Sequence, residues 1–211
     1  MRWGWAAVML ALLMPAAWAQ QYPIDAAGSE IGFEIRTRYG QRLQGSFPVF
    51  SGHLDVLPDG RHQVSLTVAA DHAEIPGYRR YTRWLRGEDF FDTGHHPLIQ
   101  LRTQPHWPQL AIDGGTLDGV LTLRGVPGLV TLNVAPAACA RPGYDCPVSG
   151  RGTVSRAAYG MDGWQFAVSD RVTFVLQVRL TGADPTWTFC SGWPCWPCWC
   201  WCWAVAAPRC R

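Results

Sequence analysis

The stretch VTFVLQVRLT, residues 172–181, is the clearest indication of the fold. Apolar residues occupy every second position from Val172 to Leu180, and most of the residues between them are polar. Successive side chains of a β-strand point to opposite faces, so this alternation predicts a strand with one buried face. We therefore expect a sheet protein whose interior is formed by the apolar faces of its strands.

The same pattern recurs in other parts of the chain, which adds strands at residues 31–36, 64–68, 117–123 and 129–134. Turn sequences rich in Gly, Pro or Asp stand between candidate strands, at residues 58–60, 113–115 and 126–128. These connections are too short to contain the crossover helices that parallel strands need. The strands are therefore predicted to be antiparallel.

One short helix is expected at Tyr78 to Arg86, where Tyr81, Trp84 and Leu85 share a face at spacings of three and four. About eight strands and one helix in the 165 residues from Gln20 to Asp184 indicate an all-β fold, an eight-stranded antiparallel barrel. The interior of such a barrel is filled by side chains or holds one slender ligand.

Residues 1–19 have the features of a secretory signal peptide. Arg2 precedes an apolar run from Ala6 to Leu13, and Pro15 and the triplet Ala17-Trp18-Ala19 follow. A membrane anchor is the alternative, but the 17 residues from Trp3 to Ala19 are fewer than the ~20 needed to span a bilayer. We expect cleavage after Ala19, export from the cytosol and no stable membrane span.

The charge of the chain is nearly balanced. The formal net charge is +2, and residues 20–184 contain 15 arginines against 16 acidic residues. Nucleic acids and anionic membranes both require a concentrated basic face, which a near-neutral composition does not predict. The composition therefore argues against both partners.

No set of residues predicts catalysis. His95 and His96 follow Glu88, Asp89 and Asp92, which resembles a metal site, but adjacent side chains of an extended segment point to opposite faces. A solvated turn before Pro97 is the preferred interpretation. No Gly-rich phosphate loop or dinucleotide motif follows a strand. We assign no catalytic residue, no metal and no cofactor.

Two groups of cysteines stand out. Cys139 and Cys146 flank a six-residue loop, and in an exported protein a disulfide is favoured over two free thiols. Residues 184–211, beyond the domain at 20–183, form a Trp- and Cys-rich tail with a further six cysteines. A thiolate metal cluster, a membrane segment and an out-of-frame or low-complexity extension are the alternatives, and we favour the last.

The chain resembles the YceI family of exported, lipocalin-like proteins over nearly all of residues 22–180. Five segments, in order and at suitable spacing, carry the resemblance. They are Phe33 to Gly40 with Gly45, Phe47, Phe50 and Gly52; LRGEDFFD at 85–92 with Pro97; GVLTLRGV at 119–126 with Val130 and Leu132; Arg156 with Tyr159-Gly160-Met161; and Asp170 with Val172.

The resemblance implies a lipocalin-like barrel whose apolar tunnel holds a polyisoprenoid chain, either an isoprenoid lipid or the tail of an isoprenoid quinone. Thr82 and Trp84 replace the acid and histidine usual in the family, which makes this wall more apolar. The tunnel residues expected on this basis, which could also simply fill the barrel, are Phe33, Ile35, Phe47, Phe50, Leu66, Val68, Trp84, Leu85, Phe90, Phe91, Leu121, Leu123, Phe174 and Leu176.

Two arginines are candidates for contact with a polar headgroup. Arg86 and Arg156 could meet a lipid head or form ion pairs with Asp89 or Asp92, and the ion pairs are the preferred interpretation. With the family resemblance, the periplasm becomes the expected destination of the exported chain, and binding, storage or transport of an isoprenoid lipid is the function favoured. An enzyme acting on a sequestered lipid and a partner-binding module are the alternatives, and a homodimer is left open.

Overall fold

The computed structural model describes residues 20–182. The predicted signal peptide and the Trp- and Cys-rich tail lie outside the described residues. Within residues 20–182, no helix is both long enough and apolar enough to cross a membrane.

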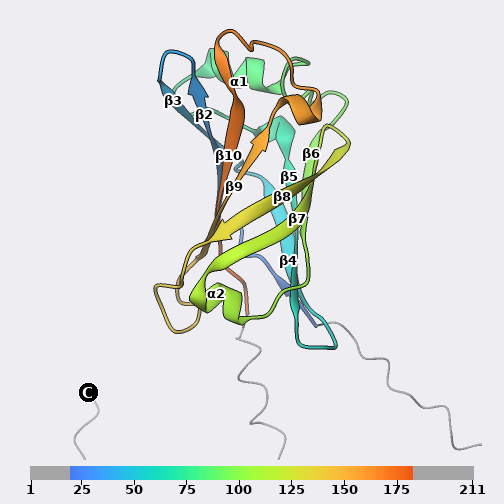
Figure 1. The fold of residues 1–211 in the computed structure, drawn as a ribbon, viewed down its shortest axis with the longest axis vertical. Helices are drawn as coiled ribbons and strands as arrows, with labels where there is room; N and C mark the ends of the chain where they lie inside the picture. Colours follow the sequence, from blue (N-terminus) through green and yellow to red (C-terminus); the bar gives the residue numbers. More distant parts are fainter. Residues whose placement is uncertain (1–19, 183–211) are drawn as a thin grey trace, which may run out of the picture.

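One antiparallel sheet makes up most of the fold, as the alternating pattern predicted (Figure 1). It has ten strands in the described residues rather than the eight expected, in the order β1-β4-β5-β6-β7-β8-β9-β10-β2-β3. Their bounds are β1 Gln20–Pro23, β2 Glu30–Thr37, β3 Arg42–Ser46, β4 Phe50–Val56, β5 His62–Ala69, β6 Leu98–Thr103, β7 Gly115–Leu123, β8 Val126–Val134, β9 Val148–Ser155 and β10 Val168–Val178.

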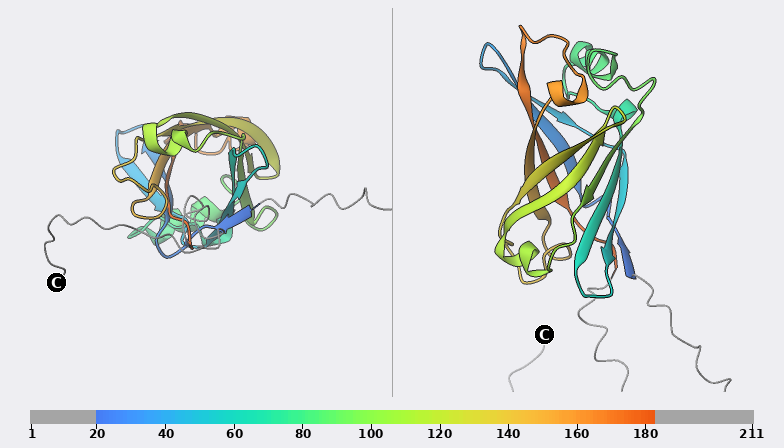
Figure 2. Two further views of the ribbon diagram at one scale, coloured as in Figure 1. Left: turned by 90° about the horizontal axis from the view of Figure 1, so that it is seen from below. Right: turned by 45° about the vertical axis from the view of Figure 1, so that its right-hand side comes forward.

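The sheet curls on itself into a barrel (Figure 2). At one end, backbone hydrogen bonds from Asp25 to Arg179 and from Thr181 to Pro23 join the end of β1 and the residues that follow it to the segment after β10. At the edge strand β3, Ser46 exchanges backbone hydrogen bonds with Glu74 instead. The 70–97 segment thus covers an edge that would otherwise present unpaired backbone groups.

The turn between β7 and β8 is shorter than expected. Only Arg124 and Gly125 connect the strands, and both have positive φ, at 52° and 73°. This two-residue geometry matches the twist of an antiparallel pair. Pro127 therefore lies within β8, opposite Thr122, and the prediction of a turn at 126–128 is wrong by about two residues.

The expected helix is present as α1, Arg79–Arg86. A second, single-turn helix, α2, Gln109–Asp113, was not expected, and short 3-10 turns occur at Ala70–His72 and Ala157–Tyr159. The two helices lie at opposite ends of the barrel, which we call the α1 end and the α2 end (Figure 1). The β2–β3 turn lies at the α1 end, and the loop that connects β8 to β9 lies at the α2 end.

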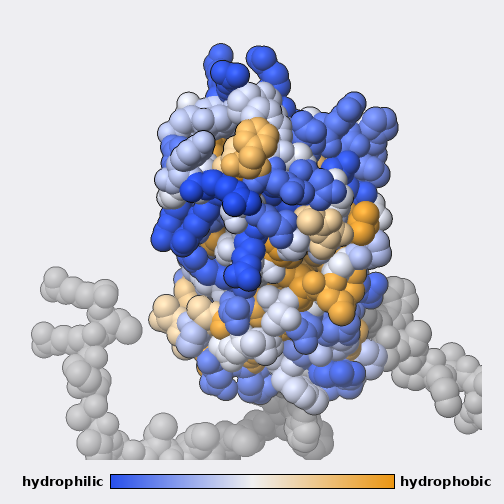
Figure 3. All heavy atoms as spheres, turned by 45° about the horizontal axis from the view of Figure 1, so that its top comes forward, coloured by the Kyte–Doolittle hydropathy of each residue, from blue (hydrophilic) through white to orange (hydrophobic). Residues whose placement is uncertain are grey.

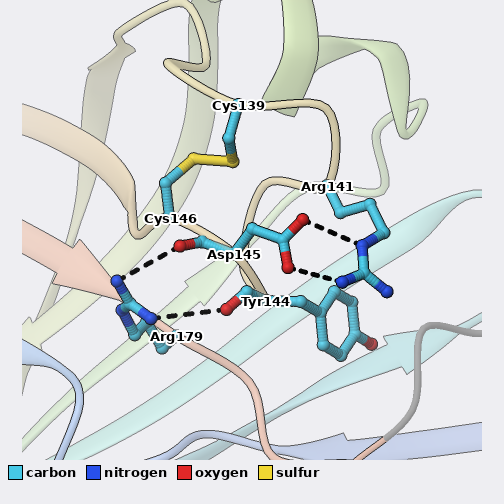
Figure 4. A network of polar contacts seen from close by, with 6 residues as sticks. All are labelled: Cys139, Arg141, Tyr144, Asp145, Cys146 and Arg179. Atoms are coloured by element: carbon cyan, nitrogen blue, oxygen red, sulfur yellow. Dashed lines mark hydrogen bonds and ion pairs between the residues drawn. A yellow bond between two sulfur atoms is a disulfide. The ribbon is translucent and has the colours of Figure 1, made fainter. Parts of the chain in front are cut away.

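The β8–β9 loop contains the expected disulfide between Cys139 and Cys146, whose Cα atoms are 6.0 Å apart (Figure 4). Within the closed loop, Arg141 donates two hydrogen bonds to Asp145, at 2.9 and 2.6 Å, and this pairing lowers the pKa of the Asp145 carboxyl. Arg179 donates to the carbonyls of Tyr144 and Asp145. The loop is therefore attached to the chain just after β10.

Candidate ligand-binding cavity

An open cavity of about 580 Å³ lies at the α1 end of the barrel. Its walls come from the β2–β3 hairpin, from α1 with the residues before it, and from residues 164–168. Small-molecule sites typically enclose about 300–1,000 Å³. We call this the outer cavity, and its lining residues are Phe33, Ile35, Thr37, Tyr39, Gln41, Leu43, Ile75, Gly77, Tyr78, Arg79, Arg80, Tyr81, Trp84, Leu85, Phe90, Trp164, Ala167 and Val168.

Two small cavities continue into the barrel. The middle cavity, of about 20 Å³, shares Phe33, Leu85 and Phe90 with the outer cavity. The inner cavity, of about 30 Å³, shares Phe174 with the middle cavity and is otherwise lined by aliphatic side chains and Phe47. The shared residues place the three cavities in series along the barrel interior. Each small cavity has room for about one water molecule.

A cluster of four phenylalanines separates the middle from the inner cavity. The ring of Phe47 lies 5.3 Å from Phe33, 5.8 Å from Phe91 and 6.5 Å from Phe174, between ring centroids. Phe33 and Phe91 also meet edge to face at 6.0 Å. Such pairs are favourable beyond their burial, so the cluster forms an aromatic partition across the barrel.

Gly45 on β3 makes room for this partition. It pairs directly with Phe33 on β2, and a Cβ at position 45 would overlap the Phe33 ring. The absence of a side chain at Gly45 therefore lets the ring lie against the backbone of the neighbouring strand.

Thirteen of the fourteen predicted tunnel residues line one of the three cavities. The inner cavity contains Phe47, Leu66, Val68, Leu121, Phe174 and Leu176. The middle and outer cavities contain Phe33, Ile35, Trp84, Leu85, Phe90, Phe91 and Leu123. Phe50 lines none of them: it pairs with Val68, is partly buried and packs against the core instead. Their role in ligand binding stays a prediction.

Several wall residues of the outer cavity were not predicted from the sequence. Leu43 lies in the polar strand β3, and Trp164 and Val168 lie in a segment without periodicity, far from α1 in the sequence. Tyr78 and Tyr81 could have been found, because they share the helical face that pointed to Trp84.

An aromatic series borders the outer cavity. Tyr78 stacks on Tyr81 at 5.4 Å, Tyr81 contacts Trp84 at 5.5 Å, and Trp84 stacks on Trp164 at 4.8 Å. The indole nitrogen of Trp164 donates to Asp89, which fixes its orientation. The Trp84–Trp164 stack thereby ties α1 to the segment before β10.

The predicted ion pairs of Arg86 and Arg156 with Asp89 or Asp92 are wrong. Arg86 donates its Nε hydrogen to the carbonyl of Ala73 at 2.9 Å. Among residues 20–182, no carboxylate lies within 4.0 Å of either guanidinium. Asp92 pairs with His95 and Arg124 instead, because the sharp turn after α1 directs it toward the β7–β8 turn.

Arg156 is buried in the barrel wall, with 1% of its surface exposed. Its guanidinium donates to the carbonyls of Ser169 and Gly163 at 3.1–3.2 Å and lies 5.3 Å from the centre of the Phe90 ring. Burial lowers the pKa of this guanidinium, while the charges of Asp170 and Asp162 oppose the shift. Arg156 lines the middle cavity but its hydrogen bonds go to the backbone.

The charged residues around His95 form a surface turn. His95 is exposed, and its Nδ1 lies 2.9 Å from Asp92, which raises the pKa of the imidazole and lowers that of the carboxyl. Within the described part of the chain, no group of three or more His, Cys, Asp or Glu residues is arranged to hold a metal ion.

Comparison with known proteins adds the decisive observation. The family sequence model of the YceI-like domain matches residues 22–180, which is most of the chain. The chain belongs to the YceI family. The barrel, whose apolar side chains line the three cavities, is therefore the YceI fold, as the sequence motifs implied. No curated protein matches the chain.

Solved structures of YceI-like proteins share the fold. Burkholderia cenocepacia BcnA is 20% identical, with a TM-score of 0.60 over 74% of this chain and 98% of that chain. A polyisoprenoid binding domain from Saccharophagus degradans, implicated in plant cell wall breakdown, is 18% identical, with a TM-score of 0.54 over 76% of this chain and 98% of its own. At these identities the likeness establishes a common fold.

Proposed function

We propose that this YceI protein binds the apolar chain of an isoprenoid lipid or isoprenoid quinone. The observation that carries the proposal is the outer cavity of about 580 Å³, which opens at the α1 end and continues toward the middle and inner cavities. The polyisoprenoid binding domain from Saccharophagus degradans, which has the same fold, supports this ligand class.

The energetics favour an apolar chain. Each CH₂ group moved from water into an apolar site contributes ~0.8 kcal/mol, so a few isoprene units outweigh the cost of ordering the chain. The deep walls, Phe33, Leu85 and Phe90, supply that environment, whereas the rim has Tyr39 and Arg79, which can face a polar head. The hydrocarbon enters first and the head stays at the rim.

The role that follows is carriage or storage of such a lipid in the periplasm. Residues 1–19 support export, and the disulfide of the β8–β9 loop is consistent with an oxidising compartment. A water-filled compartment separates membranes there, and an isoprenoid chain needs an apolar shelter to cross it.

Binding is favoured over catalysis by the composition of the walls. No Asp, Glu or His lines the three cavities formed by residues 20–182, so the walls contain neither the carboxylate nor the imidazole bases that hydrolysis or isomerisation of a lipid most often uses. A partner-binding module would rest on residues 184–211, outside the described part of the chain.

Extraction of the purified protein tests the proposal. Protein exported by its natural route is extracted with organic solvent, and the extract is examined by mass spectrometry. We expect an isoprenoid lipid or quinone at close to one molecule per chain. Ala167→Trp, which fills the outer cavity, should carry little or none, and Ala27→Trp, in the exposed turn after β1, should carry as much as the wild type.

Both variants must first retain the β circular-dichroism spectrum and the unfolding transition of the wild type. An extract without isoprenoid, or one equally rich from Ala167→Trp, would refute the proposal.

A further inference from the structure

The α1 helix concentrates positive charge at the mouth of the outer cavity. Its sequence RRYTRWLR contains four arginines and no acid. Arg79, Arg80 and Arg83 are exposed, and no carboxylate of residues 20–182 lies within 4.0 Å of them. Arg79 and Arg80 also line the cavity. The near-neutral composition thus concealed a local basic face.

Exposed aromatic side chains surround the same mouth. Tyr39, at the tip of the β2–β3 hairpin, is 92% exposed, and Tyr78 is 46% exposed. Phe166 is 75% exposed and lies against Trp164, which borders the cavity. Figure 3, with the α1 end turned forward, shows apolar surface set among strongly hydrophilic side chains.

This combination has the chemistry of a membrane–water interface. Aromatic side chains with an apolar body and a polar tip favour the headgroup level of a bilayer, and arginines are attracted to anionic lipid heads. From this arrangement of exposed arginines and aromatic side chains we infer that the α1 end docks onto an anionic lipid surface, with the mouth of the outer cavity facing the bilayer. An acidic protein surface fits less well, because it would pair with the arginines and leave the largely exposed side chains of Tyr39 and Phe166 without an apolar environment.

The inference rests on the proposed function, because a docked mouth gives a lipid a route from bilayer to cavity without exposure to water. The positions of three residues agree with that route. Arg79, Arg80 and Tyr78 line the cavity and also belong to the exposed face.

Vesicle co-sedimentation tests docking directly. The full chain is mixed with vesicles of phosphatidylglycerol and phosphatidylcholine in equal parts, or of phosphatidylcholine alone. We expect binding to the anionic vesicles only, and weaker binding as salt rises, because exposed charges are screened beyond ~10 Å at 0.1 M salt.

A charge-matched pair of variants locates the surface. The triple variant Arg79→Gln/Arg80→Gln/Arg83→Gln should bind the anionic vesicles at least about ten-fold more weakly. The control, Arg61→Gln/Arg102→Gln/Arg151→Gln, removes the same charge from elsewhere on the barrel and should bind within about two-fold of the wild type. All three proteins carry identical residues 183–211, so any contribution of that segment is common to them.

The aromatic contribution has its own pair of variants. Tyr39→Ser/Phe166→Ser should weaken binding about ten-fold while leaving its salt dependence intact, because it removes apolar area that docking would bury and removes no charge. Trp107→Ser, at an exposed aromatic residue beside α2, should have no effect.

Equal loss in the two charge variants, or equal binding to both vesicle types, would overturn the inference. Vesicle binding is scored separately from the lipid content of the purified protein. Loss of docking with an intact lipid extract would therefore overturn docking alone, and docking without any extracted lipid would overturn the proposed function alone.

Discussion

Arg156 is the largest side chain that the barrel buries completely. A buried guanidinium without a carboxylate within 4.0 Å depends on its hydrogen bonds, which here go to the carbonyls of Gly163 and Ser169. These bonds hold the loop between β9 and β10 against the barrel. Because Trp164 belongs to that loop and borders the outer cavity, Arg156 positions part of the cavity wall.

Arg156→Met should lower the free energy of unfolding by about 2–3 kcal/mol, since hydrogen bonds to charged groups are among the stronger ones. The substitution also removes the desolvation cost of the buried charge, which offsets part of that loss of stability. Urea denaturation measures the change. The exposed Arg151→Met is the matched control and should change stability by less than about 0.5 kcal/mol. A stable Arg156→Met would show that burying the charge costs as much as its hydrogen bonds contribute.

His106 predicts a pH dependence of stability. Burial lowers the pKa of its imidazole below the ordinary value of 6.5, although a hydrogen bond to the Gln104 carbonyl opposes this. As the pH falls through 6.5, the unfolded chain takes up a proton at His106 before the folded chain does. The free energy of unfolding should therefore decrease from about pH 7.5 to about pH 5.5.

Urea denaturation at the two pH values checks this, with His106→Asn as the comparison. The variant should lose part of the decrease, because its side chain does not titrate. If wild type and variant respond to pH identically, His106 is not the group responsible. The contribution of His95 to this pH dependence has the opposite sign, because its raised pKa stabilises the folded chain below pH 6.5. Its exposure to solvent keeps that contribution small.

At the scale of elements, periodicity located β2, β5, β7, β8 and β10, and it did not locate β1, β3, β4, β6 or β9. The alternation from Val172 to Val178 is confirmed as part of β10, which begins earlier, at Val168, and has a register shift between Val168 and Val172. β3 and β9 were not predicted because glycines occupy some of their inward positions and interrupt the apolar alternation. A Cβ at Gly152 would overlap Leu132, and one at Gly45 would overlap Phe33. The neighbouring strands fill these places, which local sequence cannot reveal.

The outer cavity could be predicted only in part for a related reason. The sequence identified its β2 and α1 walls, because those residues lie in periodic segments. Trp164 and Ala167 reach the cavity through the loop that Arg156 holds. Val168 reaches it from the start of β10, and Leu43 from a strand that is mostly polar. Contacts between segments far apart in sequence decide these placements, and no local pattern encodes them.

The aromatic partition predicts a limit on chain length. Affinity for prenols should rise with each added isoprene unit while the outer cavity fills, then level off where Phe33, Phe47, Phe91 and Phe174 close the barrel. Phe174→Leu should move the plateau to longer chains, because Phe174 lines both the middle and the inner cavity.

A series of prenols of increasing length, titrated into wild type and Phe174→Leu, measures the plateau. Leu129→Ala, at an exposed position on β8, is the control and should leave it unchanged. Plateaus at the same length in wild type and Phe174→Leu would mean that the partition does not set the limit.

At the scale of the whole molecule, the barrel has two dissimilar ends. The α2 end has the disulfide loop and the backbone bonds that join the end of β1 and the residues that follow it to the segment after β10, so it is tightly held. The α1 end has the outer cavity, whose walls depend on side-chain contacts between α1, the β2–β3 hairpin and the 164–168 segment. The proposed ligand is therefore expected to enter at the α1 end.

We propose that the outer cavity of this YceI protein holds one apolar isoprenoid chain. Native mass spectrometry of lipid-stripped protein mixed with an isoprenoid quinone tests it most directly. We predict a single bound quinone for the wild type and for Ala27→Trp, and none for a folded Ala167→Trp. Equal binding by Ala167→Trp, or no quinone on the wild type at saturating concentration, would show that the outer cavity is not the binding site.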